Sequence, residues 1–307
     1  MTVLHAVLYG LTATLRQKRV ILILYMMSLG FGLLLILPVV TVLFGDLGHS
    51  LAADGAESFL DVSIIADFLR ARDPDLRTYH QAASGMFLLF LLASTFLTGG
   101  LLNLLVRPRG GEFPSRFFGG CGQFFFRFLR LLGFHIAALF LIAALNLGLA
   151  WLLRFLFDDT TLAITATLFL GLKQGLIFAL LVGTAALFDY ARILTVLQDR
   201  GNMSGTLLGA AGFVFRNLKA VVLIRLLMIG AGAALLLVYW GIHRWILPEA
   251  AWISLLVVQQ FLILIKQFLK VFRYGAELNL LRGREVSEDA RLLARITSPE
   301  AMENALR

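Results

Sequence analysis

Six long apolar stretches, separated by short polar segments, dominate the pattern of hydrophobic and polar positions. Each is long enough to cross the hydrocarbon core of a bilayer, which takes about 20 residues in a helix. Within lipid such a stretch must be helical, because no water is present to satisfy backbone N–H and C=O groups. The pattern therefore predicts an all-α polytopic membrane protein with six transmembrane helices, at 20–44, 82–106, 131–153, 162–188, 220–242 and 250–272.

The overall composition agrees with this class. Of the 307 residues, 59% are hydrophobic and 15% are charged, and the mean hydropathy is +0.86. Soluble domains carry roughly 25% charged residues. The net charge of +8 is explained by basic residues at the ends of apolar stretches, so no nucleic-acid partner is expected. Cys121 is the single cysteine, which excludes an intramolecular disulfide.

Lysine and arginine placement predicts the orientation. Most basic residues lie before the first stretch, between the second and third, between the fourth and fifth, and after the sixth. We therefore expect both termini to be cytoplasmic. The segment 45–80 holds seven acidic residues and is expected on the opposite side, with a short surface helix ended by Asp73-Pro74-Asp75. The amphipathic segment 1–19 is expected to lie along the cytoplasmic interface.

An internal repeat is visible at the segments that enter the apolar stretches. Residues 120–130 align without gaps with 209–219, and both are amphipathic segments that end in two cations three positions apart. Arg16 and Arg19 repeat this cation spacing before the first stretch. These segments predict three cytoplasmic amphipathic elbow helices, each leading into a membrane-spanning pair.

The segments that leave the apolar stretches are also similar to one another. Residues 190–200 match 274–284 in length, and Gly99-Gly-Leu-Leu-Asn103-Leu-Leu resembles Gly275-Ala-Glu-Leu-Asn279-Leu-Leu. We therefore predict one six-span membrane domain over 1–285 with a cytoplasmic tail over 286–307. The domain is built as three repeated helix pairs, at about 1–109, 110–200 and 201–285.

Two local motifs carry a family resemblance. FDYARILTVLQDR (188–200) followed by FVFRNLKAVV (213–222) resembles a loose group of bacterial six-span membrane proteins. That group includes the membrane domain fused to some glycerophosphodiester phosphodiesterases. The resemblance covers the last two-thirds of the chain. It implies the six-span fold and a location in a bacterial cytoplasmic (inner) membrane, without an activity. The sequence contains no phosphodiesterase domain with its metal-binding histidines and carboxylates, so that activity is not expected.

A few polar residues lie inside the apolar stretches. They are Lys173, Gln174, Gln259, Gln260 and His135. Such residues in a membrane usually face the interior of a helix bundle or a hydrated cavity. One interpretation is a set of hydrogen bonds between helices, and the other is an intramembrane transport site. In both cases Lys173 is expected inside the bundle and paired.

Cations near the predicted cytoplasmic interface form a second candidate site. Asp189 and Arg192 are three positions apart and are expected to pair within one helix. Arg225 is expected to extend its charge toward water. The alternative to local ion pairing is the binding of anionic lipid headgroups. The headgroup-binding candidates are Arg127, Arg130, Arg192, Arg216 and Lys219.

No catalytic constellation is present in the sequence. The five histidines are scattered, and there is neither a Gly-x-Ser-x-Gly motif nor a phosphate-binding loop. We therefore expect no enzyme activity, no metal and no cofactor. The favoured function is an accessory or scaffold subunit that binds membrane lipids, a protein partner or a second copy of itself. The alternative is a transporter or channel that uses the polar residues around Lys173 and Gln259.

Overall fold

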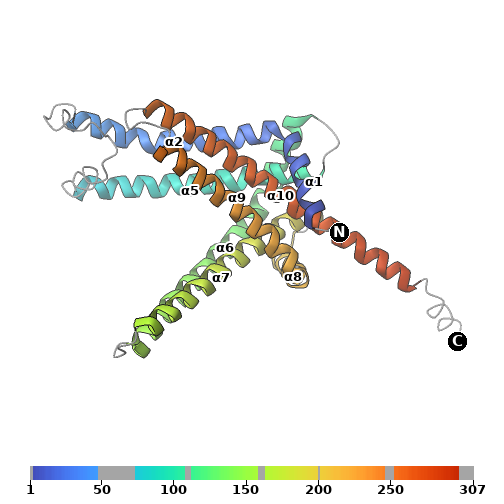
Figure 1. Cartoon of the computed structure of the whole chain (residues 1–307). Coiled ribbons are helices and arrows are strands. Elements are labelled where there is room, and N and C mark those ends of the chain that lie inside the picture. The colour runs from blue at the N-terminus through green and yellow to red at the C-terminus, as the bar shows by residue number, and fades with distance from the viewer. Residues whose placement is uncertain are drawn as a thin grey trace, which may run out of the picture. The chain divides into compact units, whose positions relative to one another are not determined.

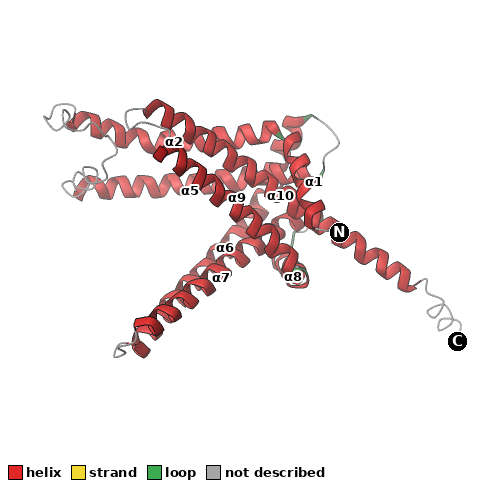
Figure 2. Ribbon diagram, viewed as in Figure 1, coloured by secondary structure: helices red, strands yellow, loops and turns green. Residues whose placement is uncertain are grey.

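The computed structural model describes residues 3–47, 73–107, 112–157, 163–199, 201–245 and 252–296. Within these ranges the chain forms eight helices and no strand, which confirms the all-α prediction (Figure 2). The helices are α1 (Val3–Arg16), α2 (Lys18–Leu47), α5 (Asp73–Val106), α6 (Phe113–Phe157), α7 (Ala163–Leu197), α8 (Met203–Arg216), α9 (Leu218–Trp245) and α10 (Trp252–Ile296).

Five of the described helices are long and apolar enough to cross a membrane, so the class of multi-pass membrane protein is supported. Their apolar segments are Lys18–Ile36, Gln81–Val106, Phe113–Leu156, Thr167–Leu197 and Leu218–Ile242. They correspond to the first five predicted stretches. The sixth stretch, 250–272, overlaps α10 from Trp252 onward but is not among these five, so a sixth span stays a prediction.

The junctions between amphipathic segments and apolar stretches differ along the chain. Single residues, Gln17 and Asn217, interrupt the helix between α1 and α2 and between α8 and α9. The Asn217 side chain donates to the Phe213 carbonyl, and its backbone has left helical geometry (φ −119°, ψ 27°). In the alignment of 120–130 with 209–219, the position of Asn217 is taken by Phe128, which is buried. Phe128 has no amide to compete for backbone groups, and α6 runs through without a break.

The connection between α7 and α8 is short. Helix α7 ends at Leu197, and the Asn202 side chain caps α8 by accepting from the Gly205 N–H at 3.3 Å. Helix α5 begins at Asp73, and the predicted end of a preceding helix at Asp73-Pro74-Asp75 stays a prediction. Proline is favourable in the first turn of a helix, where its missing N–H has no intrahelical acceptor. The predicted surface helix before it lies largely outside the described residues.

The helices belong to two compact units. Unit 1 contains Met1–Leu15, Gly99–Met228 and Phe272–Arg307, and unit 2 contains Arg16–Thr98 and Ile229–Val271. In unit 2, Phe31 of α2 meets Phe90 of α5 edge to face, with ring centroids 5.5 Å apart. In unit 1, α6 and α7 lie side by side, and α8 packs on α7 (Figure 1).

Close packing in unit 1 brings the ends of long helices against short amphipathic segments. At the end of α5, a β-carbon on Gly100 would lie 2.5 Å from the Phe117 carbonyl oxygen of α6. Asn103 donates from Nδ2 to the Arg116 carbonyl oxygen at 2.8 Å. Only glycine permits this approach of the two backbones.

A second seam joins the two ends of the described chain. A β-carbon on Gly10 of α1 would lie 2.7 Å from the Ala276 nitrogen of α10. Asn279 donates from Nδ2 to the His5 carbonyl oxygen at 3.4 Å. Asn279 and Asn103 occupy equivalent positions in the alignment of 99–105 with 275–281, so two aligned segments make the same kind of contact.

Candidate functional site

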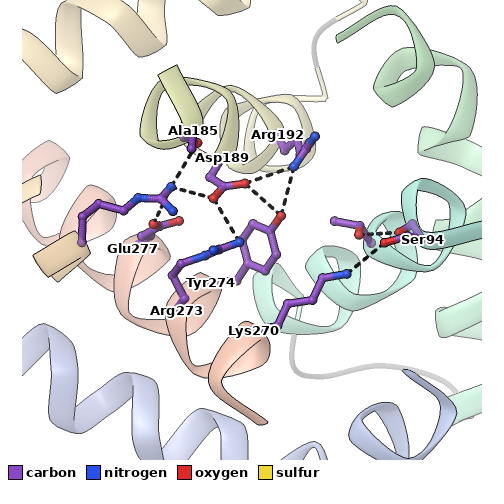
Figure 3. A network of polar contacts seen from close by, with 10 residues as sticks. Ser94, Ala185, Asp189, Arg192, Lys270, Arg273, Tyr274 and Glu277 are labelled. Atoms are coloured by element: carbon purple, nitrogen blue, oxygen red, sulfur yellow. Dashed lines mark hydrogen bonds and ion pairs between the residues drawn. The ribbon is translucent and has the colours of Figure 1, made fainter. Parts of the chain in front are cut away.

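The best-defined polar feature is a buried ion network around Asp189, near the C-terminal end of α7 (Figure 3). Its Oδ2 accepts a hydrogen bond from Arg225 Nη2 of α9 at 2.6 Å, and Arg273 Nη2 of α10 lies 3.2 Å from the same oxygen. Its Oδ1 accepts from Arg192 Nη1, one turn along α7, at 3.1 Å. One carboxylate is therefore shared by three guanidinium groups. We call Asp189, Arg192, Arg225, Arg273, Tyr274 and Glu277 the Asp189 network.

Tyr274 completes the environment of the carboxylate. Its hydroxyl donates to Asp189 Oδ1 at 3.0 Å and accepts from Arg192 Nη1 at 3.3 Å. Hydrogen bonds to a charged acceptor are stronger than those between neutral groups. The contacts with Arg225 and Tyr274 connect α7 to α9 and α10, which hold Asp189 in one orientation.

Glu277 is the second acid of the Asp189 network. Arg225 Nη2, which also donates to the Ala185 carbonyl, lies 3.0 Å from Glu277 Oε1. This charge contact lacks hydrogen-bond geometry, and among the described residues neither Glu277 oxygen is hydrogen-bonded. Burial raises the pKa of Glu277 to about 7, although Arg225 acts in the opposite direction. Glu277 is therefore an acid whose charge is only partly compensated.

Burial divides the Asp189 network into an inner and an outer part. The side chains of Asp189, Arg225 and Glu277 are 5%, 6% and 1% exposed, whereas those of Arg192 and Arg273 are 17% and 29% exposed. The three arginines outnumber the two acids. The Asp189 network thus carries surplus positive charge, and its two accessible members are both cations.

Parts of the Asp189 network follow from the sequence and parts do not. The Asp189–Arg192 pair is confirmed. The expectation that Arg225 reaches toward water is wrong, because its guanidinium is buried between Asp189 and Glu277. Arg273, Tyr274 and Glu277 were not predicted. Their position in the sequence is a signal that could have found them. Arg273 and Tyr274 directly follow the apolar stretch 250–272, and Glu277 comes three residues later. The segment 274–284 also aligns with 190–200, which directly follows Asp189.

The predicted intramembrane polar residues lie in two units. In unit 2, Gln260 Oε1 accepts from the Tyr25 hydroxyl of α2 at 3.0 Å, and Gln259 Nε2 donates to the Tyr239 hydroxyl of α9 at 3.3 Å. Two further bonds of the same kind join α10 to α2 and α5: Gln267 to Ser28 at 2.8 Å and Lys270 to Ser94 at 3.2 Å. These contacts fit the interpretation of polar residues as hydrogen bonds between helices.

The remaining three residues of that prediction belong to unit 1. Lys173 is half-buried on α7, and Gln174 next to it is exposed. The His135 ring stacks on Phe188 with centroids 4.5 Å apart. A shared site between Lys173 and Gln259 would join the two units, so it stays a prediction.

The five predicted headgroup-binding residues have different surroundings. Arg192 belongs to the Asp189 network, and Arg127 pairs with Asp199 and lies over the Phe124 ring. Arg130, Arg216 and Lys219 are exposed. The described residues contain no group of His, Cys, Asp and Glu side chains suited to a metal ion.

The described residues form helices alone, and five of these helices are long and apolar enough to support the class of a multi-pass membrane protein. A scan against protein-family models found no match, and neither did searches of curated proteins and of solved structures. The chemistry of the chain's own residues therefore carries the functional argument.

Proposed function

We propose that the protein is a non-enzymatic scaffold or accessory protein of a bacterial cytoplasmic membrane that binds anionic lipid headgroups. In this proposal the chain has six spans in three repeated helix pairs, with both termini in the cytoplasm. The observation that carries it is the two-sided character of the short amphipathic segments. One side of each packs inside unit 1, and the other exposes large apolar side chains near cations.

Helix α1 illustrates this character. Ala6, Gly10 and Thr14 are buried on one side, whereas Leu4, Leu8 and Leu15 are largely exposed. A helix with small buried residues on one face and exposed leucines elsewhere is suited to lie in a bilayer interface. The basic residues at its end, beginning with Arg16, suit the charged headgroup level.

Helix α8 has the same arrangement. Its buried residues include Thr206, Ala210 and Val214, at the spacing seen in α1, while Leu208 and Phe215 are 75% and 77% exposed. The exposed cations Arg216 and Lys219 follow directly. The N-terminal part of α6 also exposes phenylalanines, including Phe126, on a segment that buries Phe117 and Cys121. This common pattern supports the proposed repeat and a common membrane-surface role.

Lipid selectivity tests the proposal. The intact protein is purified in a neutral detergent, and retained phospholipids are counted by native mass spectrometry after exposure to phosphatidylglycerol or phosphatidylcholine. We expect a preference for phosphatidylglycerol that weakens in the double variant Arg216→Gln/Lys219→Gln. Arg154→Gln, an exposed arginine near the other end of α6, serves as the control and should retain the preference. Equal retention of the two lipids by the unmodified protein would contradict the proposal.

A transporter is the second candidate, and the buried Asp189 network is the observation that favours it. Ionisable residues in an apolar protein are costly and often mark ion or proton pathways. The helix-linking contacts of Asp189 offer a structural role as well. The two candidates differ in what they require of Lys173, because only a transporter needs its charge.

A further inference from the structure

We propose that the accessible part of the Asp189 network, formed by Arg192 and Arg273, is a binding site for the phosphate group of an anionic phospholipid. The inference rests on the proposed lipid-binding function and assigns it a specific site. The site differs from the exposed cations at the end of α8, because its arginines are held by a buried framework.

Charge is the first argument. Three guanidinium groups face two carboxylates in the Asp189 network, which leaves one positive charge uncompensated even when both acids are ionised. Uncompensated charge in a buried, low-dielectric setting is costly. An anion bound beside Arg192 and Arg273 would offset this charge. The inner arginine, Arg225, is already placed between Asp189 and Glu277.

Hydrogen-bonding capacity is the second argument. Asp189 Oδ1 accepts from Arg192 and Tyr274, and Oδ2 accepts from Arg225 and contacts Arg273. A carboxylate offers about four acceptor positions, so Asp189 has none left. A guanidinium has five N–H donors, and among the described residues Arg273 Nε has no acceptor. The two outer arginines therefore retain donors that Asp189 cannot satisfy.

The position along the chain favours a lipid as the source of the phosphate. Arg192 comes four residues after the apolar stretch 162–188, and Arg273 comes directly after the stretch 250–272. Arginines at this level commonly reach the headgroup region of a bilayer. The planar guanidinium also matches phosphate oxygens in a two-point geometry that lysine does not provide.

Arg192→Gln and Arg273→Gln test the site in the full chain, with Arg273→Lys as the charge-preserving variant and Arg154→Gln as the control. Phosphatidylglycerol is titrated into the protein in phosphatidylcholine nanodiscs, and binding is read from native mass spectra. We expect each glutamine variant to weaken binding roughly tenfold, the loss typical of a charge-assisted hydrogen bond. Arg273→Lys should bind with intermediate strength, and Arg154→Gln should match the unmodified protein.

Two further measurements separate the remaining outcomes. Thermal unfolding in phosphatidylcholine alone shows whether each variant is folded, and only folded variants are compared. If the unmodified protein prefers phosphatidylglycerol but folded Arg192→Gln and Arg273→Gln bind it equally well, the site is wrong while the proposed function stands. If the unmodified protein has no preference, the proposed function itself fails. If inorganic phosphate stabilises the protein in an Arg273-dependent way and phosphatidylglycerol does not, the occupant is a soluble anion and the lipid assignment is overturned.

Discussion

Asp189 on α7 and Arg225 on α9 form a buried ion pair, with 2.6 Å between Oδ2 and Nη2. Both side chains are buried, so water could not take the place of either partner if it were removed. Removal of one member would leave an uncompensated buried charge, which costs more than the pair itself contributes. The pair is therefore a connection between helices on which the surrounding contacts of unit 1 depend.

Asp189→Asn should destabilise the protein strongly. Asparagine preserves the shape but leaves three arginines around a neutral group, and we expect a loss of about 3–5 kcal/mol in the free energy of unfolding. Denaturant unfolding in detergent micelles measures it. Asp199→Asn is the matched control, because Asp199 pairs with Arg127 at a more exposed position and should cost at most about 1 kcal/mol. Equal losses in the two variants would contradict a special role for the Asp189 network.

Glu277→Gln should change the pH dependence of stability. Burial raises the pKa of Glu277 from its usual 4.5 to about 7. The folded state therefore holds this proton more tightly than the unfolded state, and stability falls as pH rises from about 4.5 to 7. Glutamine cannot ionise, so this fall should be absent and the variant should gain roughly 1–3 kcal/mol relative to the unmodified protein between pH 5 and pH 8.

Unfolding free energies at a series of pH values check this prediction. The charged groups that face Glu277 are Arg225 of α9, Asp189 and Arg192 of α7, and Arg273 of its own helix. All three arginines stay charged over this pH range, and the interpretation requires Asp189 to stay ionised as well. Parallel pH profiles for the variant and the unmodified protein would show that Glu277 does not titrate there.

Gly120→Ala should disrupt the seam between α5 and α6. An added β-carbon would lie 2.5 Å from Asn103 Cβ, so the helices must separate. Overpacking of this kind typically costs about 1–3 kcal/mol. Gly119→Ala is the control on the same helix, because a β-carbon on Gly119 would meet nothing within 4 Å. This variant should stabilise the protein by roughly 0.5–1 kcal/mol, since alanine favours a helix more than glycine does. Thermal unfolding of both variants in the same detergent distinguishes them, and a stable Gly120→Ala protein would rule out the tight seam.

Lys173→Met separates the two candidate functions. A charged lysine near the centre of a span costs about 2.5–3.5 kcal/mol on insertion scales. In a scaffold, the methionine variant should be as stable as the unmodified protein or more stable, with lipid retention unchanged. In a transporter, it should fold normally but lose the ion- or substrate-dependent change in stability that the unmodified protein shows. Screening both proteins for thermal shifts against inorganic ions and over a range of pH compares these outcomes.

Topology can be tested by cysteine labelling. In a Cys121→Ser background, a cysteine placed within 45–80 should react with an impermeant thiol reagent in spheroplasts, and one within 286–307 should not. The expected result follows from the distribution of lysine and arginine between the two sides. Labelling of the tail but not of the loop would reverse the proposed orientation.

The sequence predicts the helices of this protein more readily than its polar contacts. Length and apolarity suffice for a spanning helix, so five predicted stretches coincide with long apolar helices. The Asp189–Arg192 pair was also predictable, because the two residues are one turn apart. By contrast, Arg225 of α9 and Tyr274 of α10 contact Asp189 of α7 only after these three helices, which are distant in sequence, have packed together. Which helices pack side by side depends on contacts that cannot be predicted from a hydropathy pattern.

The position at which a helix is interrupted is also difficult to predict from sequence. Segments 120–130 and 209–219 align well, yet one continues into its apolar stretch and the other stops at Asn217. The difference depends on the Asn217 side chain, which donates a hydrogen bond to the Phe213 carbonyl oxygen of the preceding turn. Most positions of the two segments are similar, so their alignment predicts two amphipathic segments without showing that the single change from Phe128 to Asn217 interrupts the helix.

The seam between Gly10 and Ala276 has a consequence for biosynthesis. A ribosome delivers the chain from its N-terminus at about 5–20 residues per second. The partners of the α5–α6 seam emerge close together in time, whereas Gly10 waits on the order of tens of seconds for Ala276. Until then the small-residue face of α1 is uncovered, and a chain that terminates early leaves it so permanently.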